Sequence, residues 1–202
     1  MEITVAITGA SGAIYPFRFL NHLVCDPSVS KVYVLASTAA LRVLHEELEL
    51  GPITLRNLTE KLIESHREKI EVINNTDIGA KLASGSYPVD AMVVIPCSMG
   101  TLGSIAHGIS RDLIQRSADV MLKERRKLFL VIRDTPFNLI HLENMRLLTL
   151  AGAVIFPAIP SFYHRPASIH DAVDQFLYRI MNQMGLKPAK AYRWLGSGGE
   201  KN

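Results

Sequence analysis

The 202 residues suffice for one domain with a sizeable core, and a content of 48% hydrophobic and 20% charged residues excludes intrinsic disorder as the main state. The 22 Lys and Arg residues exceed the 19 Asp and Glu residues by only 3, which argues against nucleic-acid binding through bulk charge. Two cysteines make no disulfide framework, and no apolar run reaches the ~18 residues that span a membrane. We therefore expect a cytoplasmic protein with no nucleic-acid or membrane partner.

Apolar strands and helices alternate along the chain, which opens on a strand without the basic start of a signal peptide. Strands are expected at residues 2–8, 31–35, 69–73, 91–95, 127–133 and 154–156. Helices are expected from about residue 14 to 24, at 38–48 and 59–67, in segments running to about 124, and at 139–150 and 169–184. This order predicts an α/β protein with a three-layer Rossmann or flavodoxin-like fold and a mostly parallel central sheet. We expect a single domain over residues 1–195 and a flexible C-terminal tail over 196–202.

In such folds, ligands bind beyond the carboxyl ends of the strands. The first of these ends, residues 8–13 (TGASGA), joins a strand to a helix, where backbone N–H groups can hold a phosphate. It lacks the Gly-x-Gly-x-x-Gly pattern of dinucleotide-binding enzymes. The alternative is a Gly-rich turn in which Ser11 only caps the helix. Further hydroxyl groups at Ser37 and in residues 97–101 favour a mononucleotide site.

Several charged and aromatic residues are candidates for an anion site. Arg133 ends an almost wholly apolar strand, so we expect it to point into the ligand crevice, with Asp134 beside it as a partner or an acid. Basic residues also gather on the helix before that strand, although a solvated helix C-terminus is the alternative there. They are Arg116, Lys123, Arg125 and Arg126. Tyr163, Arg165 and Arg179 lie further along the chain and are added to the candidates.

Cys97 and the histidines are poor candidates for chemistry. Cys97 follows a buried strand, and no His and carboxylate pair can be assigned to it, which favours a small buried residue over a nucleophile. No Cys and His spacing is typical of a metal site.

Seven segments from the first strand to the last helix together resemble one family, the UbiX/Pad flavin prenyltransferases. They are residues 8–13 (TGASGA), 83–86 (ASGS), 96–102 (PCSMGTL), 112–120 (DLIQRSADV), 122–126 (LKERR), 141–145 (HLENM) and 162–166 (FYHRP). Each alone is a weak signal, but the ordered set is specific and covers nearly the whole chain.

The resemblance implies an enzyme that joins a dimethylallyl group, from dimethylallyl phosphate, to N5 and C6 of reduced FMN, without a metal. The product would be the cofactor of UbiD-type decarboxylases, and the enzyme would assemble as a homododecamer. The implied FMN-binding residues are Gly9, Ala10, Ser11, Ser37, Ser98, Met99, Gly100, Thr101 and Arg133. The implied substrate-binding residues, placed partly across subunit contacts, are Arg116, Lys123, Tyr163, Arg179 and Trp194. The implied catalytic residues are Ser11, Lys123 and Asp134.

Asp134 is the one departure from the family pattern, because relatives carry Glu at this position. Two alternatives stay open. One is an FMN-binding accessory subunit of a decarboxylase, which the departure at Asp134 favours. The other is a flavin-dependent cysteine decarboxylase of the same fold, but residues 160–166 (PSFYHRP) differ from the Pro-x-Met-Asn-x-x-Met-Trp segment of those enzymes.

Overall fold

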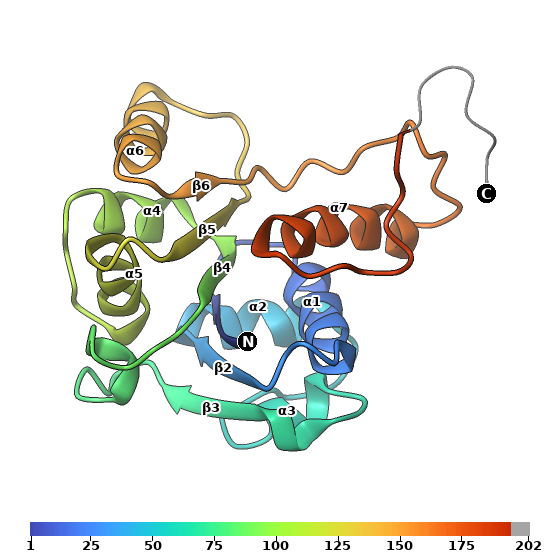
Figure 1. Ribbon diagram of the computed structural model, residues 1–202, viewed down its shortest axis with the longest axis horizontal. Helices are drawn as coiled ribbons and strands as arrows, with labels where there is room; N and C mark the ends of the chain where they lie inside the picture. The colour runs from blue at the N-terminus through green and yellow to red at the C-terminus, as the bar shows by residue number, and fades with distance from the viewer. Residues whose placement is uncertain (195–202) are drawn as a thin grey trace. The chain divides into compact units, whose positions relative to one another are not determined.

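The computed structural model describes residues 1–194 (Figure 1). The strands are β1 (Glu2–Ile7), β2 (Lys31–Ala36), β3 (Ile70–Asn74), β4 (Ala91–Cys97), β5 (Lys127–Ile132) and β6 (Val154–Ile155). The helices are α1 (Ile14–Cys25), α2 (Thr38–Glu47), α3 (Leu58–Leu62), α4 (Met99–Ala106), α5 (Leu113–Lys123), α6 (Leu139–Leu150) and α7 (Ile169–Met184). Two short 3₁₀ turns are η1 (Arg67–Lys69) and η2 (Lys81–Ala83).

The six strands form one sheet in the order β3-β2-β1-β4-β5-β6, and every pair is parallel. This is the strand order of the Rossmann-type doubly wound sheet, so the predicted fold class is confirmed. The chain leaves β1 toward β2 on one side and returns through β4 on the other. Beyond the carboxyl ends of β1 and β4, such sheets open a crevice for ligands.

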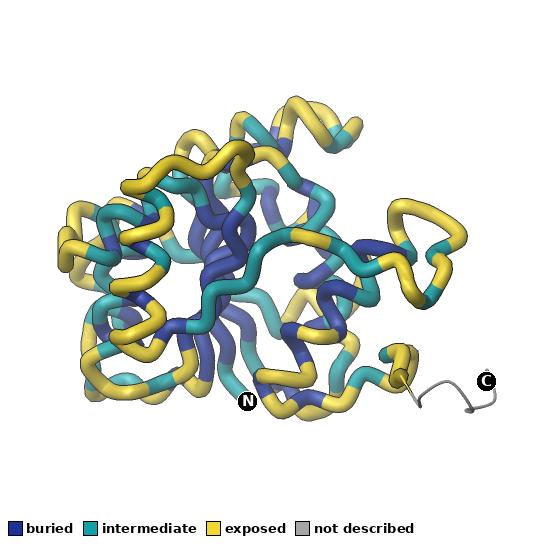
Figure 2. The backbone as a smooth tube through the Cα atoms, turned by 90° about the horizontal axis from the view of Figure 1, so that it is seen from above, coloured by how far each residue is buried: buried dark blue, intermediate teal, exposed yellow. Residues whose placement is uncertain are grey.

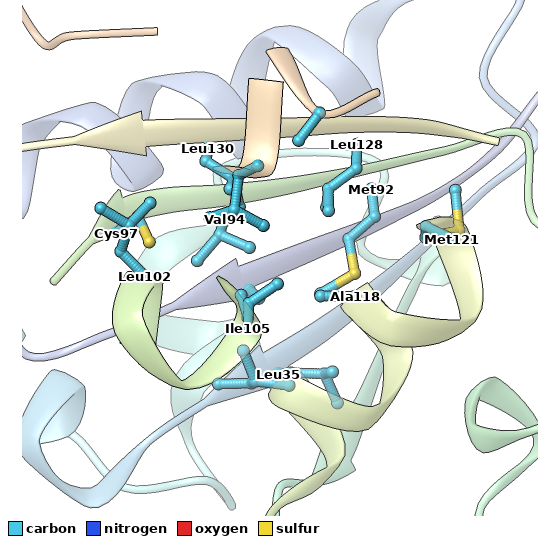
Figure 3. Packing of buried hydrophobic residues seen from close by; sticks show 14 of the residues in the cluster. Leu35, Met92, Val94, Cys97, Leu102, Ile105, Ala118, Met121, Leu128 and Leu130 are labelled. Carbon is cyan, nitrogen blue, oxygen red and sulfur yellow. The ribbon is translucent and has the colours of Figure 1, made fainter. Parts of the chain in front are cut away.

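Both faces of the sheet are covered by helices, as the apolar strands predict. Helix α1 contacts β1, β2 and β4, whereas α4 and α5 pack on the opposite face (Figure 1). The core on that second face includes Val94, Leu102, Ile105 and Leu130 (Figure 3). Figure 2 shows the buried strands enclosed by helices whose outer surfaces are exposed. Among the described residues, no helix combines the length and the apolar character needed to cross a membrane.

The chain folds into two compact units, Met1–Ala158 and a C-terminal unit that begins at Ile159. The first holds the whole sheet. In the second, α7 is capped at its start by Ser168, whose side chain accepts a hydrogen bond from the Asp171 N–H, and ends at Gly185 in the left-handed region. The single domain over residues 1–195 stays a prediction, and the predicted tail over 196–202 lies outside the described residues.

One predicted helix, over residues 59–67, is wrong in its extent. Helix α3 ends at Leu62, and His66 has a positive φ of 53°. The cause is a side chain on α1. Asn21 donates from Nδ2 to the Leu62 carbonyl at 2.7 Å and accepts from the Glu64 N–H at 3.0 Å. These bonds occupy backbone groups that a longer helix would need.

Candidate active site

The loop between β1 and α1 requires glycine at two positions. Gly12 has a φ of +117°, a region that side chains with a Cβ rarely adopt, and a Cβ on Gly9 would come within 2.5 Å of the Ala39 Cβ. The cap of α1 is Ala13, without a side-chain hydrogen bond. The alternative in which Ser11 serves as the helix cap is therefore wrong, and its hydroxyl has another partner.

That partner is Glu47, the last residue of α2, which sequence reasoning missed. Its Oε2 accepts hydrogen bonds from the N–H groups of Gly12 and Ala13, at 2.8 and 2.7 Å. Burial alone would raise the pKa of this carboxyl, but the hydrogen bonds from Ser11, Ala13 and Gly12 and the charge of Arg133 outweigh burial and lower it. No local pattern marks Glu47, because the loop it binds lies 35 residues away in the chain.

Serines begin the helices that follow β2 and β4. The Ser37 hydroxyl accepts from the Ala40 N–H at 3.0 Å, and the Ser98 hydroxyl accepts from the Thr101 N–H at 3.3 Å. Beside Gly100, in the first turn of α4, a Cβ would meet no atom within 4 Å, so the helix start is open on that side. Two helix N-termini with hydroxyl groups therefore lie at the carboxyl ends of β2 and β4, the strands on either side of β1. This arrangement is suited to phosphate binding.

Arg133 links the ends of β5 and β1. Its Nε donates to the Ser11 carbonyl at 2.9 Å, which places the guanidinium beside the Gly-rich loop as the sequence predicts. The next residue, Asp134, is exposed, and its Oδ1 accepts a hydrogen bond from the Thr135 N–H at 2.8 Å. The side chain thus bends back over its own loop.

We call the loops after β1, β2, β4 and β5, together with the first turns of the helices that follow them, the carboxyl edge. It carries ten of the predicted site residues: Gly9, Ala10, Ser11, Ser37, Ser98, Met99, Gly100, Thr101, Arg133 and Asp134. Its ligand-facing groups are backbone N–H groups, hydroxyls and one guanidinium, with Glu47 as the carboxylate among them. This donor set fits a phosphate monoester joined to a larger polar group.

Lys123 ends α5 just before β5 begins, at the opposite end of the sheet, which we call the amino edge, whereas Arg116 lies one turn into α5, whose first residues bond to Asn75 after β3. Arg116 Nε donates to the Ala83 carbonyl at 3.2 Å, and Lys123 forms an ion pair with Glu124. Both residues border the loop that leads into β4. Because β1 has six residues at ~3.3 Å each, the two edges are about 20 Å apart. Within one chain, Lys123 therefore does not join Ser11 and Arg133.

The remaining predicted residues belong to the C-terminal unit. The ring of Tyr163 contacts those of Tyr192 and Trp194, at centroid distances of 5.4 and 6.2 Å. Gln175 on α7 holds this segment, because its side chain accepts from the Tyr192 N–H and donates to the Lys190 carbonyl. Tyr163 and Trp194 thus come together, and Arg179 is exposed on α7.

Cys97 is a packing residue, as the sequence predicts. It is fully buried beside Leu102 (Figure 3), and burial raises the pKa of its thiol to about 12, so the thiol stays protonated at neutral pH. Within residues 1–194, no group of three or more His, Cys, Asp and Glu side chains is placed to hold a metal ion.

Comparison with known proteins decides the family. The Flavoprotein family model matches residues 1–177. Flavin prenyltransferase UbiX of Pseudomonas aeruginosa is 44% identical over 197 residues, which cover 96% of this chain and 93% of the relative. The chain belongs to the UbiX family of flavoproteins. The resemblance predicted from the sequence motifs is thereby confirmed.

Solved structures of UbiX proteins share the fold. The crystal structure of AnUbiX (PadA1) in complex with FMN and dimethylallyl pyrophosphate has a TM-score of 0.86 and 40% identity, covering 96% of this chain and 97% of that one. A dodecameric FMN-dependent UbiX-like decarboxylase from Escherichia coli O157:H7 has a TM-score of 0.86 and 37% identity, covering 97% and 100%.

Proposed function

We propose that this UbiX family member is a flavin prenyltransferase, which transfers a dimethylallyl group from dimethylallyl phosphate to N5 and C6 of reduced FMN. The observation that carries this proposal is the carboxyl edge, where loops from four strands present phosphate-binding groups at the point where the strand order reverses. Family membership over nearly the whole chain supports the same activity.

The carboxyl edge fits FMN. Its phosphate is suited by the open space beside Gly100 and by the serine-capped starts of α2 and α4. The close approach of Gly9 to Ala39 fixes the position of the loop after β1. Ser11, Met99 and Arg133 would border the rest of the molecule. Reduced FMN, when bound, supplies the nitrogen and carbon that accept the prenyl group.

The residues of this chain would prepare that reaction in two ways. Glu47 accepts a hydrogen bond from the Ser11 hydroxyl, which leaves the serine oxygen able to accept a hydrogen bond from a group bound at the loop. Cations at the prenyl phosphate would stabilise the charge that grows on the departing oxygens. We assign that second role to Lys123, with Asp134 as the acid, and we assign binding of the dimethylallyl phosphate to Arg116, Lys123, Tyr163, Arg179 and Trp194.

Lys123 can serve this reaction only in the site of a neighbouring copy, because the length of the strands separates it from its own carboxyl edge. Helix α6 supports such an assembly: Leu139, Ile140 and Leu150 are 72%, 69% and 74% exposed, and apolar side chains in this number favour contact with another subunit. We therefore propose a homododecamer in which active sites are completed between copies.

We further propose that the product passes to a UbiD-type decarboxylase. A cytoplasmic location stays a prediction.

The test is anaerobic incubation of the protein with reduced FMN and dimethylallyl phosphate, followed by mass spectrometry of the extracted flavin. We expect a flavin heavier by one C5H8 group. Lys123→Ala should still bind FMN but form no product, whereas Arg56→Ala, which removes an exposed cation elsewhere in the same unit, should behave as the wild type. Bound but unmodified FMN, with the monophosphate and with the diphosphate, would instead indicate an accessory FMN-binding subunit.

A further inference from the structure

A pair of tyrosines at the amino edge is not used by the proposed reaction. Tyr33, on β2, is only 2% exposed, and its hydroxyl donates to Glu2 Oε2 at 2.8 Å. The Tyr87 hydroxyl lies 2.6 Å from that of Tyr33 and also donates to Glu2 Oε2 at 3.2 Å, and the two rings meet edge to face at 5.9 Å. Burial, followed by the hydrogen bonds with Tyr87 and Glu2, raises the pKa of Tyr33, so the Tyr33 hydroxyl stays protonated.

The pair is enclosed by further charges. The Lys81 ammonium lies 4.3 Å from the centre of the Tyr33 ring and 5.3 Å from that of Tyr87, and it also pairs with Glu71 at 2.9 Å. Tyr87 is therefore attached to the first residues of the sheet through its hydroxyl, its ring and its neighbour Lys81.

The other side of the same loop is held by α5 and the residues after it. Arg126 donates from its two terminal nitrogens to the carbonyls of Tyr87 and Gly85, at 2.8 and 2.6 Å. Arg116 donates to the Ala83 carbonyl. Residues 83–87 are thus fixed from two directions, although they form a loop.

This loop in turn borders Lys123. A Cβ at Gly85 would lie 2.6 Å from Lys123 Nζ and closer still to Glu124 Oε1, so the glycine backbone and the lysine ammonium are in contact. Any shift of the loop would change the space in which the lysine lies.

We propose that Tyr87, anchored by Tyr33 and Glu2, is a positioning residue that holds residues 83–87 against Lys123 and Arg116 and so sets the affinity for the prenyl phosphate. This inference rests on the proposed function. A phosphate is contacted by these cations both before and during the reaction, and loss of such a contact weakens substrate binding more than it slows turnover.

Tyr87→Phe tests the proposal, because it removes the hydroxyl and keeps the ring. We expect the KM for dimethylallyl phosphate to rise roughly fivefold to tenfold, as for the loss of one buried hydrogen bond, with a smaller change in kcat and unchanged FMN affinity. Tyr33→Phe should act in the same direction but more weakly, because Tyr87 keeps its own bond to Glu2, and the double variant should be little worse than Tyr87→Phe.

A matched control separates positioning from general destabilisation. Leu62→Val removes a buried methylene from α3, outside the tyrosine pair and its loop, and should lower the melting temperature without raising this KM. An unchanged KM in Tyr87→Phe, or an equal loss of FMN affinity, would overturn the proposal.

Calorimetric titration of the full-length, FMN-loaded protein with dimethylallyl phosphate measures the affinity for this phosphate without turnover. A wild-type protein that binds this phosphate but forms no product would contradict the proposed function. The same titration would still test the role of residues 83–87. If Tyr87→Phe binds the phosphate as tightly as the wild type does, the proposed positioning role is wrong.

Discussion

Glu47 shows how a single carboxylate can organise a glycine-rich loop. It accepts hydrogen bonds from two backbone N–H groups and from the Ser11 hydroxyl, and it lies near the charge of Arg133. The ionised carboxylate accepts hydrogen bonds from the Gly12 and Ala13 N–H groups, a role that no side chain of the loop itself fills. The carboxyl edge therefore has its geometry set before any ligand binds.

Glu47→Gln should lower the free energy of unfolding at pH 7 by about 1 kcal/mol. The amide has no charge, and its NH₂ group can face the N–H donors of the loop, while solvent screens part of the lost electrostatic attraction. The pKa of Glu47 is lowered by folding, so its contribution is fully present above the unfolded value of about 4.3 and is lost as the pH falls through the lower folded value. Denaturant unfolding of both proteins at pH 7 and at lower pH measures this. A gap between them that widens as the pH falls would contradict the assignment.

Asp134→Glu should keep or raise turnover. The aspartate bends back to the Thr135 N–H, and a side chain longer by one methylene extends further toward a bound substrate. Displacements of ~1 Å at a reacting group can cost ~100-fold in rate. Single-turnover formation of the prenylated flavin measures the effect, and a large loss of rate would show that Asp134 is not the equivalent of the glutamate in relatives.

At the scale of elements, the carboxyl edge is built from interlocked loops. The buried Thr8 hydroxyl donates to the Pro96 carbonyl at 2.7 Å and accepts from the Ser98 N–H at 2.8 Å, which ties the end of β1 to the start of α4. Gly9 lies against Ala39 at the start of α2. The relative positions of three loops therefore depend on short contacts between them.

Gly9→Ala should weaken FMN binding and destabilise the fold by roughly 1–3 kcal/mol, because its methyl group would overlap the Ala39 Cβ. Adding Ala39→Gly removes the overlap, apart from the cost of glycine in a helix, and should restore much of the affinity. Flavin fluorescence titration of the three variants measures this. An equal loss of affinity in the double variant would show that another contact decides the position of the loop.

The extents of the elements were mostly predictable from periodicity. Helix α7 matches the predicted 169–184, and α2 and β2 differ from their predictions by one residue at one end. The end of helix α3 was not predictable from periodicity, because Asn21 on α1 ends this helix through two hydrogen bonds. Periodicity records which face of a segment is apolar, but it does not record a bond from a distant side chain.

At the scale of the whole molecule, the strands separate the two groups of predicted site residues. Ser11 and Arg133 lie at one edge, and Lys123, at the end of α5, lies at the other. A site that uses both groups needs two copies of the chain, and closed symmetric assemblies provide that arrangement repeatedly.

Mixed assemblies test this directly. Lys123→Ala and Arg133→Ala should each be inactive alone, but co-expression should restore activity, because about a quarter of the sites in a random mixture combine an intact Arg133 from one copy with an intact Lys123 from its neighbour. The product formed per FMN measures it. A mixture as inactive as its components, with the assembly intact by size-exclusion chromatography, would show that the two residues act within one chain.

The sequence by itself determined the parallel α/β fold, the family and the residues at the strand ends, because strand alternation and the glycine and serine motifs are local features. Only the tertiary structure showed that Glu47 holds the Gly-rich loop, that Tyr87 anchors the loop beside Lys123, and that Lys123 lies at the far edge of the sheet. Each of these depends on residues distant in the chain, and hydrogen bonds that join such residues leave no periodic signal in the sequence.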